Sequence, residues 1–142
     1  MKREPKRRFW SLDSIEFLSK ELKLPEYSQL FQDWPFQVAD TEDLDRYLEL
    51  FYTLASDSEA RFTLTDIIIQ AFDDILGSDN ATEFCTDKRW TSFLDVLDNG
   101  FQYHEWQVWY WSGFDDEERD DEDNFHVAEY MRKIWYRRLR PN

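Results

Sequence analysis

Between residues 63 and 77 the chain reads TLTDIIIQAFDDILG, and this stretch decides the fold class. Its apolar residues recur at intervals of three and four, which is the period of one face of an α-helix. These residues are Leu64, Ile67, Ile68, Ala71, Phe72 and Ile75. Thr63 and Asp66 have the spacing of a capping box, and Gly77 stands where a left-handed residue commonly ends a helix. We predict a long core helix from Thr63 to Gly77.

The same apolar period recurs in five other segments. They are residues 12–22, 27–34, 44–55, 84–97 and 124–135. Ser11 or Asp13 can cap the first of these helices, and Asp40 can cap the third. Pro35 is expected to stop the second helix, because proline cannot donate a backbone hydrogen bond. The chain has only three Gly and four Pro, too few for the turns of a sandwich or barrel. The sequence therefore predicts an all-α fold, a compact bundle of about six to seven helices.

Residues 95–111 allow two interpretations. The dipeptide Asn99-Gly100 is a strong hairpin signal and also a good helix stop. Aromatic spacing from Phe101 to Phe114 suits a helix, whereas Trp106, Val108 and Tyr110 alternate as in a strand. We favour Gly100 as a helix stop at position C′, and the alternative is a minor β-hairpin near residues 95–111.

Length and composition predict one folded domain over residues 1–142. Apolar residues make up 42% of the chain and aromatic residues 18%, which is unlike a disordered acidic chain. Cys85 is the only cysteine, so no intrachain disulfide can form and a reducing compartment is expected. We find neither the apolar core of a signal peptide behind the basic start nor an apolar run of about 20 residues. A cytoplasmic protein that does not enter the membrane is therefore predicted.

Charge is the strongest compositional signal, because the net charge is −14. Residues 1–9 form a basic N-terminal tail, and residues 132–140 carry five basic side chains and no acidic one. An acidic run over residues 115–123, with eight carboxylates and one Arg, is predicted to lie in a solvated loop at 113–124. Its residues do not follow the ligand pattern of an EF-hand. Most of the surface should repel nucleic acid and attract a basic protein partner.

Neither histidine belongs to a recognisable metal motif. His104 and Glu105 begin like a metalloprotease helix, but Val108 stands where the second His is required. His126 and Glu129 have the i, i+3 spacing of a bundle metal site, yet such sites use several elements of this kind. There is no nucleophile elbow and no phosphate-binding glycine loop. We predict no catalytic residue, no cofactor and no metal.

Residues Leu12 to Glu16 read LDSIE, which resembles the Asp-Ser-Leu element of acyl carrier proteins. The resemblance would imply that Ser14 carries a phosphopantetheine arm at the start of a helix. It covers about five residues, and the helix that precedes this element in the family does not fit into the eleven residues before it. Ser14 is therefore interpreted as a polar residue in the first turn of a helix.

Four aromatic residues crowd into six positions, at Trp106, Trp109, Tyr110 and Trp111. Aromatic residues at helical spacing usually fill a core, but four in six positions cannot all point inward. At least one should reach the surface beside the acidic loop and serve as an interface anchor. The residues predicted to bind a partner are Asp115, Asp116, Glu117, Glu118, Asp120, Asp121, Glu122, Trp106, Trp109 and Trp111.

Together these features indicate a binding protein and not an enzyme. A bacterial immunity protein or antitoxin is expected, one that neutralises a cationic toxin such as a nuclease by protein-protein binding. A closely related alternative is a DNA-mimic inhibitor of a DNA-binding protein. A different class is an adaptor or regulatory subunit of a larger complex, whose basic ends contact nucleic acid or an acidic subunit. A helical enzyme that uses carboxylates ranks third.

Overall fold

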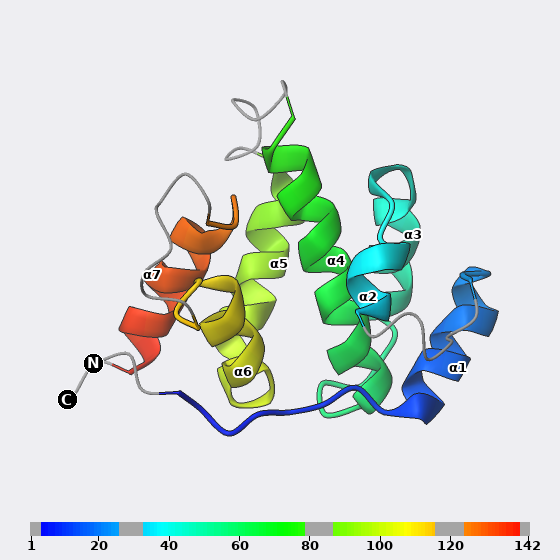
Figure 1. Cartoon of the computed structure of the whole chain (residues 1–142), viewed down its shortest axis with the longest axis horizontal. Helices are drawn as coiled ribbons and strands as arrows, with labels where there is room; N and C mark the ends of the chain where they lie inside the picture. Colours follow the sequence, from blue (N-terminus) through cyan, green and yellow to red (C-terminus); the bar gives the residue numbers. More distant parts are fainter. Residues whose placement is uncertain (1–3, 26–32, 79–86, 116–123, 140–142) are drawn as a thin grey trace. The chain divides into compact units, whose positions relative to one another are not determined.

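Every regular element in the described part of the chain is a helix. The computed structural model describes residues 4–25, 33–78, 87–115 and 124–139, and within them seven α-helices and one 3₁₀ helix are found (Figure 1). No strand occurs in these ranges. The predicted all-α fold is confirmed. The elements are α1 (Leu12–Leu22), α2 (Trp34–Val38), η1 (Thr41–Asp43), α3 (Leu44–Phe51), α4 (Glu59–Leu76), α5 (Lys88–Asn99), α6 (Phe101–Trp111) and α7 (Ala128–Arg138).

Contacts divide the chain into two units. The N-terminal unit is Phe9–Phe72, and the C-terminal unit is Asp73–Asn142 together with Met1–Arg8. The N-terminal unit holds α1, α2, η1, α3 and most of α4, and the C-terminal unit holds α5, α6 and α7. In the C-terminal unit α6 packs against α5 and α7, and α5 packs against α7.

Helix α1 begins and ends as its sequence predicts. The Ser11 hydroxyl accepts a hydrogen bond from the Ser14 N–H at 3.1 Å, which is the N-cap geometry. Its buried face is Ile15, Leu18 and Leu22. The helix ends at Lys23, which takes the left-handed conformation with φ 54°.

Pro35 begins a helix and does not end one, so the predicted stop is wrong. It lies in the first turn of α2, where a missing N–H costs nothing because no helical acceptor precedes it. Trp34 beside it is buried, and its indole N–H donates to the Pro25 carbonyl at 2.8 Å. The part of the predicted 27–34 helix that precedes residue 33 lies outside the described residues.

Helix α4 begins at Glu59, four residues before the predicted start. The Ser58 hydroxyl accepts from the Arg61 N–H at 3.0 Å, so Ser58 performs the capping. Thr63 and Asp66 lie inside the helix and are buried. The predicted capping box is wrong because both side chains bond to other residues, as described below. Residues Arg61 to Ile69 are all buried, as expected for a helix packed on every side.

Gly77 follows the end of α4, as predicted, but it does not take the left-handed conformation. Its N–H donates to the Asp73 carbonyl at 3.0 Å. A Cβ at this position would lie 2.7 Å from Nε2 of His126. A side chain at this position would therefore displace the exposed imidazole of His126, and no special backbone angle calls for glycine here.

The hairpin near residues 95–111 is wrong. Residues 88–99 and 101–111 are the two helices α5 and α6, and Gly100 separates them. The Gly100 N–H donates to the Val96 carbonyl at 2.9 Å, and φ is −101°. A two-residue hairpin turn of the Asn-Gly type needs positive φ at both central positions, which this geometry lacks. Gly100 is the predicted stop, without the predicted left-handed conformation.

The last predicted helix is confirmed with a later start. Helix α7 begins at Ala128 and not at Asn124, and it buries Met131, Ile134 and Trp135. Helix α6 is kinked at His104, whose φ of −123° is not helical. The kink turns the Phe101–Tyr103 segment away from a regular continuation of the helix.

Candidate functional site

The three tryptophans predicted to bind a partner differ in exposure. Trp109 is 5% exposed and Trp111 is 1% exposed, whereas Trp106 is partly exposed. The Trp111 ring lies 4.7 Å from the ring centroid of Phe125, which fixes it within the C-terminal unit. The Trp109 ring contacts the Trp106 ring in a tilted arrangement, with 5.0 Å between the centroids. Among the three, Trp106 has the most exposed side chain.

Asp115 is the one residue of the acidic run that the structure describes. Asp115 is exposed, and Asp116, Glu117, Glu118, Asp120, Asp121 and Glu122 lie outside the described residues. The ends of the predicted 113–124 loop meet, because the Asn124 side chain packs against Gly113 and leaves no room for a Cβ there. Gly113 has φ +79°, a conformation that glycine adopts without strain.

A second acidic surface was missed by sequence reasoning. Glu42, Asp45 and Glu49 are exposed on η1 and α3, at intervals of three and four, opposite the buried stripe of α3. We call these three residues the acidic row. Tyr52 continues the same side of the helix and is 49% exposed. Helical spacing of the carboxylates was the signal that could have revealed this row.

The acidic row stands on a well-anchored turn. The Asp40 carboxylate accepts from the Glu42 N–H at 2.9 Å and so caps η1. The Asp40 N–H donates to the Tyr47 hydroxyl at 3.0 Å, which ties the turn to α3. Burial raises the pKa of Tyr47, so its hydroxyl stays protonated and donates to the Val38 carbonyl.

Arg46 is the only basic residue in the sequence of α3. Arg46 pairs with Asp43 at 3.2 Å and donates to the Leu22 carbonyl at 2.9 Å. Across residues 9–72 the sequence has thirteen acidic and four basic side chains. The field at this part of the surface is therefore negative.

The basic N-terminal tail is docked at its described end. The Arg8 guanidinium donates to the Tyr103 carbonyl at 3.0 Å, and the Arg7 guanidinium lies 5.3 Å from the ring centroid of Trp106. Both contacts fall on α6. These two arginines interact with their own chain and not with solvent alone.

The basic C-terminal helix is also engaged. Arg137 and Arg138 both pair with Asp98 of α5, at 3.3 and 2.7 Å. Arg132 donates to the Ser112 carbonyl at 2.8 Å. These contacts hold α7 onto α5 and α6, which gives the basic residues at this end a structural role.

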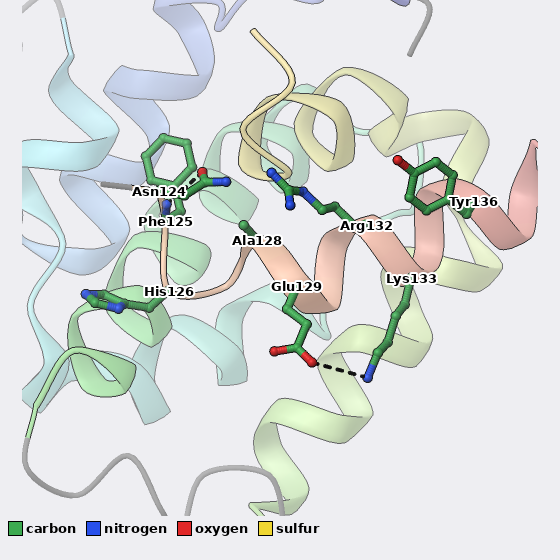
Figure 2. Close-up of a pocket in the computed structure, with 8 residues that line it drawn as sticks. All are labelled: Asn124, Phe125, His126, Ala128, Glu129, Arg132, Lys133 and Tyr136. Carbon is green, nitrogen blue, oxygen red and sulfur yellow. Dashed lines mark hydrogen bonds and ion pairs between the residues drawn. The ribbon is translucent and has the colours of Figure 1, made fainter. Parts of the chain in front are cut away.

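A hollow runs along α7 (Figure 2). It is lined by Asn124, Phe125, His126, Ala128, Glu129, Arg132, Lys133 and Tyr136. Glu129 pairs with Lys133 at 3.8 Å, and in Figure 2 the His126 ring points away from both. Among the residues described, no group of three or more His, Cys, Asp or Glu side chains is placed to hold a metal ion.

The other residues with potential chemistry are buried. His104 is 1% exposed, and its Nδ1 lies 2.7 Å from Oε1 of Gln107. Ser14 is 4% exposed, and its hydroxyl bonds the Ser11 carbonyl and the Thr63 hydroxyl, each at 2.7 Å. A buried hydroxyl with two partners is not placed to carry a phosphopantetheine arm.

Asp73 joins α4 to the start of α7. Its carboxylate is 9% exposed and accepts from the Val127 N–H at 3.1 Å, across 54 positions of sequence. Burial raises the pKa of Asp73 above its usual range, against the opposing effects of the Val127 N–H and the nearby His126. The negative charge of Asp74 also raises the pKa of Asp73. The carboxylate is therefore held in place at some cost to stability when it is ionised.

Asp73→Asn is expected to stabilise the chain relative to wild type increasingly as pH rises. A raised folded pKa means that the cost of ionising Asp73 is absent below the ordinary aspartate value of about 3.9 and complete above the folded value. Asn retains an oxygen for the Val127 N–H but has no charge. Urea unfolding at several pH values between 4 and 8 measures the difference. A constant difference across this range would contradict the prediction.

Asp73→Ala is the matched control for the hydrogen bond. It removes the charge and the acceptor together, so the Val127 N–H loses its partner, and we expect a loss of about 1–3 kcal/mol relative to Asp73→Asn.

Comparison with known proteins identifies no relative of this chain. The chain matches no protein-family model, no curated protein and no solved structure. None of the helices in the described ranges combines the length and apolar character needed to cross a membrane. A function for this chain is therefore inferred from its own surfaces.

Proposed function

We propose that this chain is a non-enzymatic acidic inhibitor of the immunity or antitoxin type, which binds a basic protein toxin and blocks it. A nuclease fits this chemistry best. The observation that carries the proposal is the exposed acidic surface of the N-terminal unit. Ten of its described carboxylates are exposed: Asp13, Glu16, Glu21, Asp33, Asp40, Glu42, Asp45, Glu49, Asp57 and Glu59.

Charge supports a nuclease as the partner class. A nuclease cleft is basic because it holds phosphates, and an acidic surface enters the same field. Opposite potentials speed the encounter and exclude acidic partners. The acidic row places three carboxylates along one helix face, which matches a target with several separated cations.

Aromatic residues at the surface support stable binding after the encounter. Tyr52 lies at the end of the acidic row, and Trp106 is partly exposed on α6. Tyrosine and tryptophan are the side chains that most often dominate the binding energy of an interface. An inhibitor needs such anchors, because exposed charges alone form weak and salt-sensitive contacts.

The engaged basic ends favour an inhibitor over an adaptor. The adaptor alternative requires the basic ends to contact nucleic acid or an acidic subunit. Arg7, Arg8, Arg137 and Arg138 instead hold contacts inside the C-terminal unit. Using them for a partner would cost those contacts.

Co-expression tests the proposed function. The chain is produced in cells together with the product of the adjacent gene, and with a nuclease of unrelated sequence as the control. We expect growth to be restored against the neighbour alone, and a complex to be recovered by affinity purification. Absence of protection, combined with co-purification in a stable endogenous assembly, would establish the adaptor class instead. Displacement of a DNA-binding protein from DNA would establish the DNA mimic.

A further inference from the structure

The chain carries a bound guanidinium pair on α6. Arg7 lies over the ring of Trp106, and Arg8 donates to the Tyr103 carbonyl at 3.0 Å. Arginine stacks on aromatic faces and donates several hydrogen bonds in one plane, so the two contacts suit the same kind of side chain. Arg7 and Arg8 therefore bind to a surface of α6 within the C-terminal unit.

The receiving surface is built by the fold of α6. Trp109 is 5% exposed, and its ring contacts the Trp106 ring in a tilted arrangement with 5.0 Å between the centroids, which supports the more exposed ring. Tyr103 immediately precedes the kink at His104, and a kink is where carbonyls turn toward donors outside the helix. His104 is fixed by its contact with Gln107. The Trp106 ring and the Tyr103 carbonyl are therefore both positioned by the kinked helix α6.

We propose that this surface, the arginine site, receives an arginine of the cationic partner, and that Arg7 and Arg8 occupy it in the free chain as a tethered competitor. The arginine site is defined as the Trp106 ring and the Tyr103 carbonyl. The inference rests on the proposed function, because it assumes that the partner is cationic. The ligand that we expect at the arginine site is an arginine-rich segment of a protein, because Arg7 and Arg8 are the side chains that bind there in the free chain.

Tethering sets the expected size of the competition. A short flexible tether gives an effective concentration on the order of 1 mM. For a free arginine-rich peptide with a Kd of about 0.1 mM, a resident segment of equal intrinsic affinity weakens apparent binding about tenfold. The partner therefore gains affinity when the N-terminal segment is released.

A peptide that copies residues 1–9 of the chain, MKREPKRRF with an amidated C-terminus, tests the arginine site. It is titrated into the full-length chain and followed by tryptophan fluorescence and calorimetry. The double variant R7A/R8A is expected to bind the peptide about ten times more tightly than wild type does. Adding Trp106→Ala to that variant should weaken binding by about tenfold or more. The matched control K20A/K88A removes the same charge at two exposed positions outside the N-terminal segment and should behave as wild type.

Equal binding by wild type and R7A/R8A would overturn the inference, as would an unchanged affinity after Trp106→Ala. If circular dichroism shows that R7A/R8A does not fold, R7K/R8K serves instead. Lysine keeps the charge but loses planar stacking, and we expect a gain of about threefold. If R7A/R8A and Trp106→Ala do not change peptide binding but co-expression still protects the cells, the arginine site is rejected and the proposed function is retained. If the variants change peptide binding as expected but co-expression does not protect the cells, the proposed function is rejected and the arginine site is retained.

Discussion

Trp111→Ala is expected to lower the free energy of unfolding by about 3–5 kcal/mol, the range for truncating a large aromatic in a core. Trp111 is 1% exposed, and its ring contacts Tyr110 at 5.7 Å and Phe125 at 4.7 Å. The cavity left behind would lie where residues on both sides of the acidic loop meet. Urea unfolding monitored by far-ultraviolet circular dichroism measures the loss.

Trp106→Ala is the matched comparison, because it removes the same side chain five positions earlier on α6. Trp106 is partly exposed and its ring has a tilted contact with Trp109, so a loss of about 1 kcal/mol is expected. The two variants should therefore separate stability from binding. A Trp111→Ala variant that keeps its stability and loses its partner would identify Trp111 as an anchor, as the sequence first indicated.

The fold class was predictable because helical periodicity depends only on local spacing. The stripe Leu44, Tyr47, Leu48 and Phe51 is buried as its pattern requires, and Ser11 and Asp40 cap the elements that follow them. Such signals need no knowledge of distant residues. Helices α1, α3, α4, α5 and α7 therefore follow from the sequence with small shifts at their ends.

Features that depend on distant residues were not predictable. Thr63 has the spacing of a cap, but its hydroxyl bonds Ser14 from 49 positions away. Asp66 completes the same pattern, yet it accepts from the Trp10 indole at 2.7 Å. Both side chains form hydrogen bonds with residues distant in the sequence, and a local sequence motif contains no information about such partners. The seating of Arg7 on Trp106 is of the same kind, because a basic tail read from sequence has no visible receptor.

The acidic row was hidden for a different reason. Thirty-one acidic residues in one chain make most carboxylate patterns expected by chance. The sequence-based prediction of a binding surface was placed on the run at 115–123, because consecutive carboxylates are easily recognised in a sequence. Exposure was the missing quantity, since Glu42, Asp45 and Glu49 become a candidate surface only when the opposite side of α3 is known to be buried.

Reversing the acidic row with E42K/D45K/E49K is expected to slow association with the cognate toxin about 100-fold at low salt. Each exchange changes the local charge by two units, and electrostatic steering commonly contributes between 10- and 1,000-fold to an association rate. The dependence of the rate on ionic strength should flatten as well, because the steering field is what salt screens. Stopped-flow mixing at about 20 and 200 mM salt measures both effects.

A second triple reversal, E16K/E21K/D57K, distinguishes a docking surface from general charge. These positions are also exposed carboxylates of the N-terminal unit, and the change in net charge is identical. If the acidic row contacts the toxin, the second variant slows association only severalfold and leaves the dissociation rate unchanged, because it changes the general field of the unit and leaves the acidic row intact. The neutral variant E42Q/D45N/E49Q should fall between wild type and reversal, which separates lost attraction from added repulsion. Equal effects of the two reversals would mean that net charge steers the toxin and that the acidic row is not where it docks.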